Sequence, residues 1–335
     1  MSSRWNSSLL VLCVGLISGC GDDTNPNVGA SQPTPYEIAY PAYFPELEVT
    51  PTNPTTVEGI ALGRRLYYDP IMSNDGRFCG GCHEQQYGFT VPGSNILPHV
   101  NLGWSENFLW NGKKKGTLEE MMMFEVGEFF GTDVTKLQNH PEYPKLFAAA
   151  FGSDAITNEL AAKGLAQFFR VLASYNSKFD RLLRDEDKLS EEEHLGFLIF
   201  NTEKGDCFHC HTLPLMTDNG FHNIGLDATF SGDNEGRFAV TQKPVDLGKF
   251  KTPTLRNVAL RMPYMHDGRF TTLEEVVEHY NSGVQLSPSL DPIMTKPGKE
   301  FGLKLTAQEK AALVAFLKTL TDDTFTTDPD LANPF

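Results

Sequence analysis

The chain has 335 residues, 40% of them hydrophobic, and a formal net charge of −15. This length allows two ordinary domains, each with its own core. The acidic balance argues against a nucleic-acid partner and is compatible with a basic redox partner. Of the six cysteines, two lie in the first 20 residues and four in two short motifs, so none is left for a structural disulfide.

Residues 1–19 have the features of an export signal. A single Arg4 precedes an apolar run over residues 9–17, which is too short to span a bilayer as a permanent helix. The run ends in Leu-Ile-Ser-Gly-Cys, which resembles a bacterial lipobox with Cys20 as the acylated residue; ordinary signal cleavage nearby is the alternative. We expect an exported, periplasmic protein whose only membrane contact is a lipid anchor at Cys20.

Residues 20–55 are rich in Asp, Asn, Pro, Thr and Ser, and seven of them are prolines. This composition predicts a tether followed by an extended wrap rather than a packed domain. From Thr56 onward apolar residues recur at helical spacing, so a helix is expected before the first cysteine motif.

Two short motifs have the C-x-x-C-H pattern of a c-type haem attachment site, and they are Cys79, Cys82 and His83, then Cys207, Cys210 and His211. Cysteines three positions apart lie on one face of a helical turn, so both thiols reach the two vinyl groups of one porphyrin. The histidine that follows offers its imidazole to the iron as the proximal ligand. A zinc ligand pair or a redox dithiol is the alternative for one motif alone. Two copies on a chain with an export signal predict two covalently bound c-type haems.

Several later stretches predict helices. Capping boxes, which mark helix starts, pair Thr117 with Glu120, Ser190 with Glu193, Thr272 with Glu275 and Thr306 with Glu309. Apolar residues at helical intervals predict a further helix within residues 156–174. No alternating run is long enough to form a sizeable sheet, so the expected class is mainly α.

The chain also repeats itself, because a Leu-Gly pair precedes each haem motif, with the glycines at Gly63 and Gly196. A duplicated module with a boundary near Arg184 accounts for this repeat. We therefore expect two cytochrome-c-like haem domains in tandem, residues 56–184 and 185–335. The last helix is expected to pack on a haem domain, with packing back on the first domain as one option.

Further stretches occur in a familiar order, at residues 66–70, 88–90, 101–104, 108–112, 179–181, 250–257 and 263–268. Together with the two haem motifs they resemble the bacterial di-haem cytochrome c peroxidase and MauG family, from about residue 56 to the C-terminus. The resemblance implies unequal haems: the N-terminal haem reacts with peroxide, and the C-terminal haem passes electrons to it. By match, Trp110 takes the place of the tryptophan between the haems; a core aromatic is the alternative.

The distal ligand of the C-terminal haem has more than one candidate. The family segment that brings this ligand is similar to the stretch from Thr272 to Tyr280, and Tyr280 stands where the peroxidases have a methionine and MauG-type enzymes a tyrosine. Methionine raises the haem potential, whereas a phenolate favours the ferric state. A packed aromatic at Tyr280, with Met265 or His279 as the ligand, is the alternative.

At the N-terminal haem the resemblance implies an open or displaceable sixth site. His99 follows His83 at a spacing where some family members place a displaceable histidine; a structural or surface histidine is the other interpretation, and we expect an open site. The family also has a glutamate that moves a proton between the peroxide oxygens. Glu128 is the first choice and Glu125 the second, with solvated helix-end glutamates as the alternative.

The resemblance also implies a calcium ion between the haems, held by an asparagine side chain and backbone carbonyls. Asn95 with the carbonyls of Thr252 and Thr254 matches that set, and oxygen ligands suit calcium.

The expected function is the reduction of H2O2 to water with electrons from a small cytochrome c or cupredoxin. A MauG-like oxidase, which uses peroxide to oxidise residues of a partner protein, is the second hypothesis, and Tyr280 favours it. A plain di-haem electron carrier is the third, and the lack of a second strong ligand near His83 argues against it.

Overall fold

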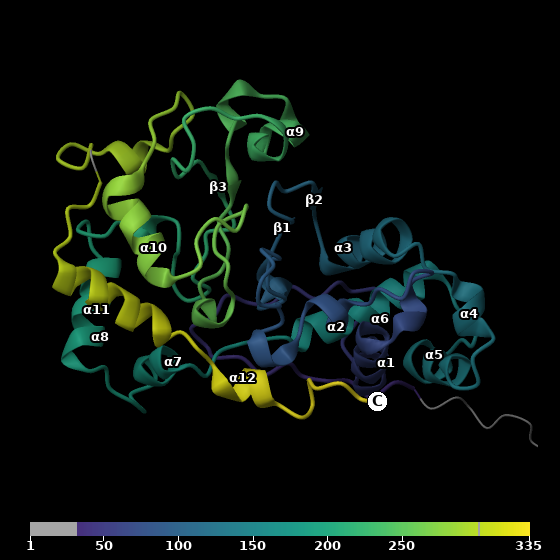
Figure 1. Ribbon diagram of the computed structural model, residues 1–335. Helices are drawn as coiled ribbons and strands as arrows, with labels where there is room; N and C mark the ends of the chain where they lie inside the picture. Colours follow the sequence, from purple (N-terminus) through teal and green to yellow (C-terminus); the bar gives the residue numbers. More distant parts are fainter. Residues whose placement is uncertain (1–31, 301) are drawn as a thin grey trace, which may run out of the picture. The chain divides into compact units, whose positions relative to one another are not determined.

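The computed structural model describes residues 32–300 and 302–335 (Figure 1). The predicted signal, Cys20 and the first part of the tether lie outside the described residues. Helices dominate the described part of the chain, and its strands form only two antiparallel two-stranded ladders, so the mainly α prediction is confirmed. Among the described residues no helix has both the length and the apolar character that a membrane span requires.

The helices of the first half are α1 (Val57–Tyr68), α2 (Cys79–Cys82), α3 (Leu118–Phe124), α4 (Val134–Gln138), α5 (Tyr143–Phe151) and α6 (Asn158–Val171). Those of the second half are α7 (Lys178–Leu183), α8 (Glu191–Phe200), α9 (Phe238–Thr241), α10 (Leu273–Glu278), α11 (Ala307–Lys318) and α12 (Asp323–Thr327). Strand β1 (Asn107–Phe108) pairs with β2 (Lys114–Lys115), and β3 (Phe221–His222) pairs with β4 (Phe250–Lys251). All four predicted capping boxes are confirmed, at the starts of α3, α8, α10 and α11.

Each half is built around one close pair of helices, α1 with α6 and α8 with α11 (Figure 1). A glycine sits at each crossing. A Cβ atom added to Gly63 would lie 2.0 Å from the carbonyl oxygen of Gly164, and one added to Gly196 would lie 1.9 Å from that of Ala312. Only glycine lets the two backbones approach this closely. The repeated Leu-Gly pair of the sequence therefore marks the same helix crossing in both halves.

The buried apolar residues form two clusters, one drawn mainly from α1, α3, α5 and α6 and the other mainly from α8, α10 and α11. Along the chain the first cluster reaches Leu172, and the second begins at Phe179. The division into domains near Arg184 stays a prediction. Two residues behind α11, Phe325 and Leu331, belong to the first cluster, so the end of the chain returns to the first half.

The segment before α1 packs on the first half as an extended wrap. Asn53 is almost fully buried and accepts a hydrogen bond from the side-chain amide of Gln167 in α6, whose amide oxygen accepts from the backbone N–H of Thr56. The buried guanidinium of Arg170 pairs with Glu119 at the start of α3. These contacts satisfy polar groups that a bare extended chain would leave unpaired in the interior.

Buried polar contacts also tie the connection between the two halves. Asp180 of α7 is fully buried and forms two hydrogen bonds with the Arg256 guanidinium, at 2.7 and 2.8 Å. Asp322, just before α12, accepts from the Ser174 hydroxyl at 3.0 Å and from the next two backbone N–H groups. The connection between the two halves is thus held in place by buried hydrogen bonds.

Candidate active site

The first cysteine motif forms a single helical turn, α2, which places both thiols on one side of the chain. The backbone N–H of His83 closes the turn by donating to the carbonyl of Cys79 at 2.9 Å. The His83 Nδ1–H donates to the carbonyl of Phe89 at 2.9 Å, and this leaves Nε2 as the nitrogen that can bind iron. Burial lowers the pKa of His83 to about 4, so the imidazole is neutral, as a metal ligand must be.

The second motif repeats this geometry on a short 3₁₀ helix, Cys207–His209. The backbone N–H of His211 donates to the carbonyl of Cys207 at 2.9 Å, and its Nδ1–H donates to the carbonyl of Met216 at 3.1 Å. Burial lowers the pKa of His211 to about 4 as well. The four cysteines of the two motifs are all free of disulfides.

One further feature is shared by the two motifs. The carbonyls that orient the imidazoles come from Phe89, with φ of 58°, and Met216, with φ of 57°. Non-glycine residues rarely adopt this left-handed conformation, which costs of order 1–3 kcal/mol. The fold therefore holds a strained backbone at the same functional position in both halves.

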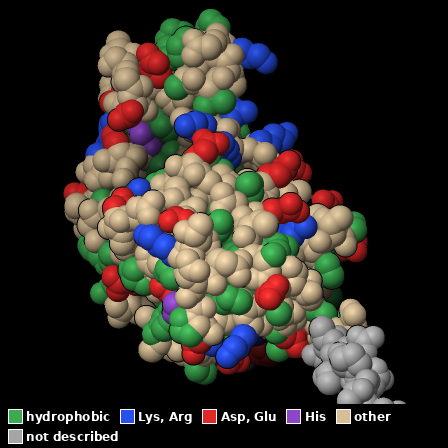
Figure 2. Space-filling model, turned by 90° about the vertical axis from the view of Figure 1, so that its right-hand side faces the viewer, with side chains coloured by type: hydrophobic (Ala, Val, Ile, Leu, Met, Phe, Trp, Pro, Cys, Tyr) green, Lys and Arg blue, Asp and Glu red, His purple; other side chains and the backbone are tan. Residues whose placement is uncertain are grey.

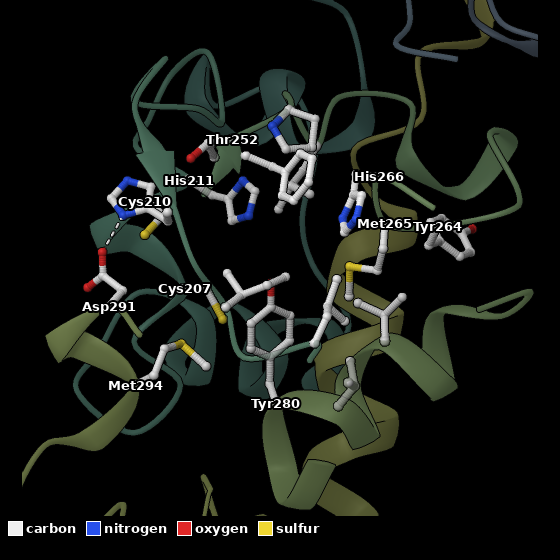
Figure 3. A pocket seen from close by; sticks show the side chains of 18 of the residues that line it. Cys207, Cys210, His211, Thr252, Tyr264, Met265, His266, Tyr280, Asp291 and Met294 are labelled. Atoms are coloured by element: carbon white, nitrogen blue, oxygen red, sulfur yellow. Dashed lines mark hydrogen bonds and ion pairs between the residues drawn. The ribbon is translucent and has the colours of Figure 1, made fainter. Parts of the chain in front are cut away.

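A cavity opens beside the second motif and encloses about 1760 Å³ free of protein atoms, part of it open to solvent. Cys207, Cys210 and His211 lie along it, and Tyr280 points its phenol toward His211 from the other side (Figure 3). Among the described residues, neither His211 Nε2 nor the Tyr280 hydroxyl has a hydrogen-bond partner. Two thiols and two unsatisfied polar atoms that face one apolar cavity fit a haem at this position.

The phenol of Tyr280 is placed by a π-helical segment, His279–Gly283, that continues α10. Burial raises the pKa of Tyr280, so in the absence of a cation the phenol keeps its proton. Met265 also reaches the cavity, from a backbone with φ of 72° (Figure 3). The other alternative, His279, is buried and donates from Nε2 to the carbonyl of Ile224 at 3.0 Å, so this nitrogen is already in use. Tyr280 and Met265 remain the two candidates for the distal position.

At the first motif the two glutamates have opposite environments. Glu128, the first choice from the sequence, has a side chain that is 65% exposed and pairs with Lys114 at 3.2 Å. Glu125 is partly buried, and burial raises its pKa to about 7. Burial raises the pKa of the Cys79 thiol as well, and the charge of Glu125 raises it further. The two glutamates thus differ in exposure, and the acid/base role of either one stays a prediction.

An internal alignment singles out Glu125. Glu125 opens a π-helical segment, Glu125–Phe129, that continues α3 in the way that the segment carrying Tyr280 continues α10. Counted from the capping threonines, Thr117 and Thr272, both residues stand eight positions on. π-Helical segments inside α-helices are frequent at functional sites. The two capping boxes in the sequence already contained this signal, which points to Glu125 in the first half and Tyr280 in the second.

His99 lies beside His83. Their rings are stacked with centroids 3.4 Å apart and planes 13° apart, and the Tyr67 hydroxyl is 3.1 Å from His99 Nδ1. This spacing leaves no room for a porphyrin between the two rings. The role of His99 at the first haem stays a prediction.

Trp110 lies where the two halves meet. Its indole N–H donates to the carbonyl of Asn95 at 2.8 Å, and its own carbonyl accepts from the backbone N–H of Lys251 in β4 at 2.8 Å. Trp110 also lines the cavity of the second motif. The tryptophan is therefore fixed by hydrogen bonds to segments on both sides.

The predicted calcium donors are brought near one another in part. Asn95 and Thr252 both line the cavity of the second motif. The side-chain amide of Asn95 donates to the carbonyl of His266. The carbonyl of Thr252 accepts from the Thr217 hydroxyl at 2.7 Å and lies 3.4 Å from the Lys251 ammonium. A cationic side chain thus already contacts one of the expected donors.

Comparison with known proteins agrees with this arrangement. A family model described as di-haem cytochrome c peroxidase matches residues 57–188. The methylamine utilization protein MauG of Methylorubrum extorquens is 34% identical over 93% of this chain and 92% of its own. The cytochrome c551 peroxidase of Nitrosomonas europaea is 31% identical over 85% of this chain and 84% of its own.

A solved structure gives the same result for the fold. The crystal structure of a MauG-like protein associated with microbial copper homeostasis superposes with a TM-score of 0.81 at 31% identity. The match covers 89% of this chain and 99% of that one. Membership of this group implies two c-type haems, which the two C-x-x-C-H motifs fit. The chain belongs to the di-haem cytochrome c peroxidase and MauG family.

Proposed function

We propose that this protein is a di-haem peroxidase that reduces H2O2 to water with electrons from a small redox protein. The proposal rests on one observation: two equivalent helix positions carry different side chains, a carboxyl at Glu125 and a phenol at Tyr280. A carboxyl with a pKa of about 7 can exchange a proton near neutral pH. A phenol is a strong ligand for ferric iron and can fill the second site.

A haem held at the first motif by Cys79, Cys82 and His83 would supply an iron that can bind peroxide and exchange electrons. Glu125 accepts a proton from one oxygen of H2O2 and donates it to the other, so the leaving oxygen departs as water. The complete reaction consumes two electrons and two protons for each H2O2 and gives two waters. Trp110 offers an aromatic path between the halves, since its hydrogen bonds hold it against both.

The test is stopped-flow mixing of the di-haem protein with H2O2. We expect rapid oxidation by peroxide, followed by repeated turnover when a reduced small cytochrome c or cupredoxin is supplied in excess. A protein that does not react with peroxide in either redox state would instead be an electron carrier.

A second candidate function is favoured by Tyr280. A MauG-like enzyme uses peroxide to oxidise residues of a partner protein, and three of the relatives carry the name MauG. In that case peroxide alone would give an oxidised state that lasts for minutes and is poorly reduced by small cytochromes. Rapid decay of the oxidised state with an added cytochrome donor would support the peroxidase proposal instead.

We also propose that the protein is exported to the periplasm and held to a membrane by lipid on Cys20. The supporting features are the apolar run of residues 9–17 and the cysteine that ends the lipobox-like stretch. Metabolic labelling with a fatty-acid analogue should mark the wild-type protein and not a Cys20→Ala variant. Labelling of both variants would contradict the anchor at this residue.

The charges on the protein surface say little about where a basic electron donor would dock. On the face drawn in Figure 2, acidic and basic side chains are interspersed, although the net charge is −15. Long-range attraction of a basic donor would therefore arise from the whole acidic molecule, and it should weaken with ionic strength.

Calcium binding at Asn95, Thr252 and Thr254 stays a proposal. It is supported by two of the donors facing one cavity, and the Lys251 ammonium at the Thr252 carbonyl opposes it. Calcium removal by a chelator should lower peroxide turnover and thermal stability if the ion is bound. Unchanged turnover, with no calcium detected by elemental analysis, would exclude the site.

A further inference from the structure

The charged side chains that line the cavity of the second motif can be sorted by whether they have a partner. Its three carboxylates are all paired: Asp206 with Lys299, Asp227 with Arg269 and Asp291 with His222. Two further cations line the same cavity, Arg261 and Lys251. Neither of them forms an ion pair with any described residue.

Lys251 is buried and Arg261 is partly buried. The Arg261 Nε atom is buried and makes no hydrogen bond to the described residues. Lys251 is 6% exposed, and its ammonium has only the carbonyl of Thr252, at 3.4 Å. Burial lowers the pKa of Lys251 to about 8; the charge of Asp218 opposes this shift, and the positive charge of Arg261 adds to it. Two cationic side chains without an ion-pair partner among the described residues thus line one cavity.

An unpaired buried charge costs several kcal/mol, and Arg guanidinium groups are well suited to binding carboxylates. A haem brings two carboxylates, its propionates, to the cavity that the two cations line. We propose that Arg261 and Lys251 bind the two propionates of the haem attached at Cys207 and Cys210. The proposal depends on the presence of this haem and not on peroxide turnover.

Lys251 also contacts the first half, because its backbone N–H donates to the carbonyl of Trp110, and both residues line the cavity. The two cations also favour the reduced haem, because reduction adds a negative charge next to them.

Spectroelectrochemical titration of the di-haem protein tests this proposal. Replacing either cation, by Arg261→Gln or Lys251→Met, should lower the midpoint potential of the C-terminal haem. At a fixed applied potential we expect the ratio of reduced to oxidised haem to fall roughly tenfold, equivalent to about 59 mV for one electron. The propionate bands in the resonance Raman spectrum of this haem should shift in the same variants.

Lys299→Met is the matched control, because it removes a cation from the same cavity while Asp206 keeps Lys296 at 2.9 Å. Its potential and propionate bands should stay close to those of the wild type. Arg261→Lys keeps the charge and should retain most of the potential, so it carries the test if Arg261→Gln fails to fold.

Three results would overturn the proposal. The first is an equal potential in the wild type, Arg261→Gln and Lys251→Met, with haem content unchanged. The second is a fall in potential without any change in the propionate bands. The third is a wild-type potential that depends on added phosphate at constant ionic strength, because a free anion would then occupy the two cations. Each measurement is made without peroxide, so failure here leaves the proposed function untouched.

Discussion

The two halves of this protein share a scaffold and differ at one position in it. Both have a glycine at a helix crossing, a cysteine motif that ends in a neutral histidine, and a strained residue whose carbonyl orients that histidine. Both also continue a capped helix into a π-helical segment. Eight positions after the capping threonine, the first half has Glu125 and the second has Tyr280. The two halves therefore share the elements around the cysteine motifs and differ in this side chain.

Removal of the Glu125 carboxyl is the strongest test of the difference between the two halves. Glu125→Gln keeps the shape of the side chain but cannot take up a proton, so peroxide turnover should fall at least ~10²-fold. Steady-state kinetics with a reduced cytochrome donor measure the change. Glu128→Gln is the matched control and should stay within a few-fold of the wild type, because Glu128 is exposed and paired with Lys114. Equal losses in both variants would refute the assignment to Glu125.

The helix crossings test whether the two halves are also equivalent in packing. Gly63→Ala and Gly196→Ala each place a Cβ atom within 2.0 Å of a backbone carbonyl oxygen, so the helices must move apart. Each substitution should lower the free energy of unfolding by about 1–3 kcal/mol. Thermal unfolding with both haems attached measures the loss. Gly127→Ala is a suitable control, since no atom lies within 4 Å of its added Cβ.

The pH dependence of peroxide turnover should reflect the ionisation of Glu125, in the first half. Glu125 must be ionised to accept the first proton, and its pKa is raised to about 7 by burial. The value of kcat/KM should therefore fall on acidification below about pH 7, approaching tenfold per pH unit, and level off above it. Stopped-flow rates between pH 5 and 9 check the profile. In Glu125→Gln this dependence should disappear, and its persistence would identify another titrating group.

The Tyr280→Met substitution tests the difference between the halves in the second half. A phenolate ligand favours ferric iron and methionine favours ferrous iron, so the potential of the C-terminal haem should rise. We expect the ratio of reduced to oxidised haem to increase roughly tenfold at a fixed potential, equivalent to about 59 mV. Redox titration followed by visible absorption measures this rise. An unchanged potential would instead favour Met265 as the ligand already present.

Features that depend on a few neighbouring residues were predictable from the sequence. The haem motifs, the capping boxes and the mainly α class all follow from local spacing, and the structure has each of these local patterns. The choice between Glu125 and Glu128 did not follow. Residues three apart share a face of an α-helix, but the π-helical segment changes that register, and only the tertiary fold shows which side chain turns inward.

Other features needed contacts between residues far apart in the sequence. His99 stacks on His83 because the loop after Phe89 folds back, and nothing in the spacing of the two histidines reveals this. The missing partner of Arg261 is likewise a property of its surroundings. The correspondence between Glu125 and Tyr280, by contrast, is visible in the sequence, because aligning Thr117 with Thr272 puts the two residues at the same position.

The return of the chain end to the first half constrains the order of assembly. Phe325 and Leu331 complete the first apolar cluster, and the Tyr68 hydroxyl and the Arg64 guanidinium bond to carbonyls of the last residues. These contacts join positions more than 250 residues apart. The first apolar cluster is therefore complete only after residues 325–332 have packed against it.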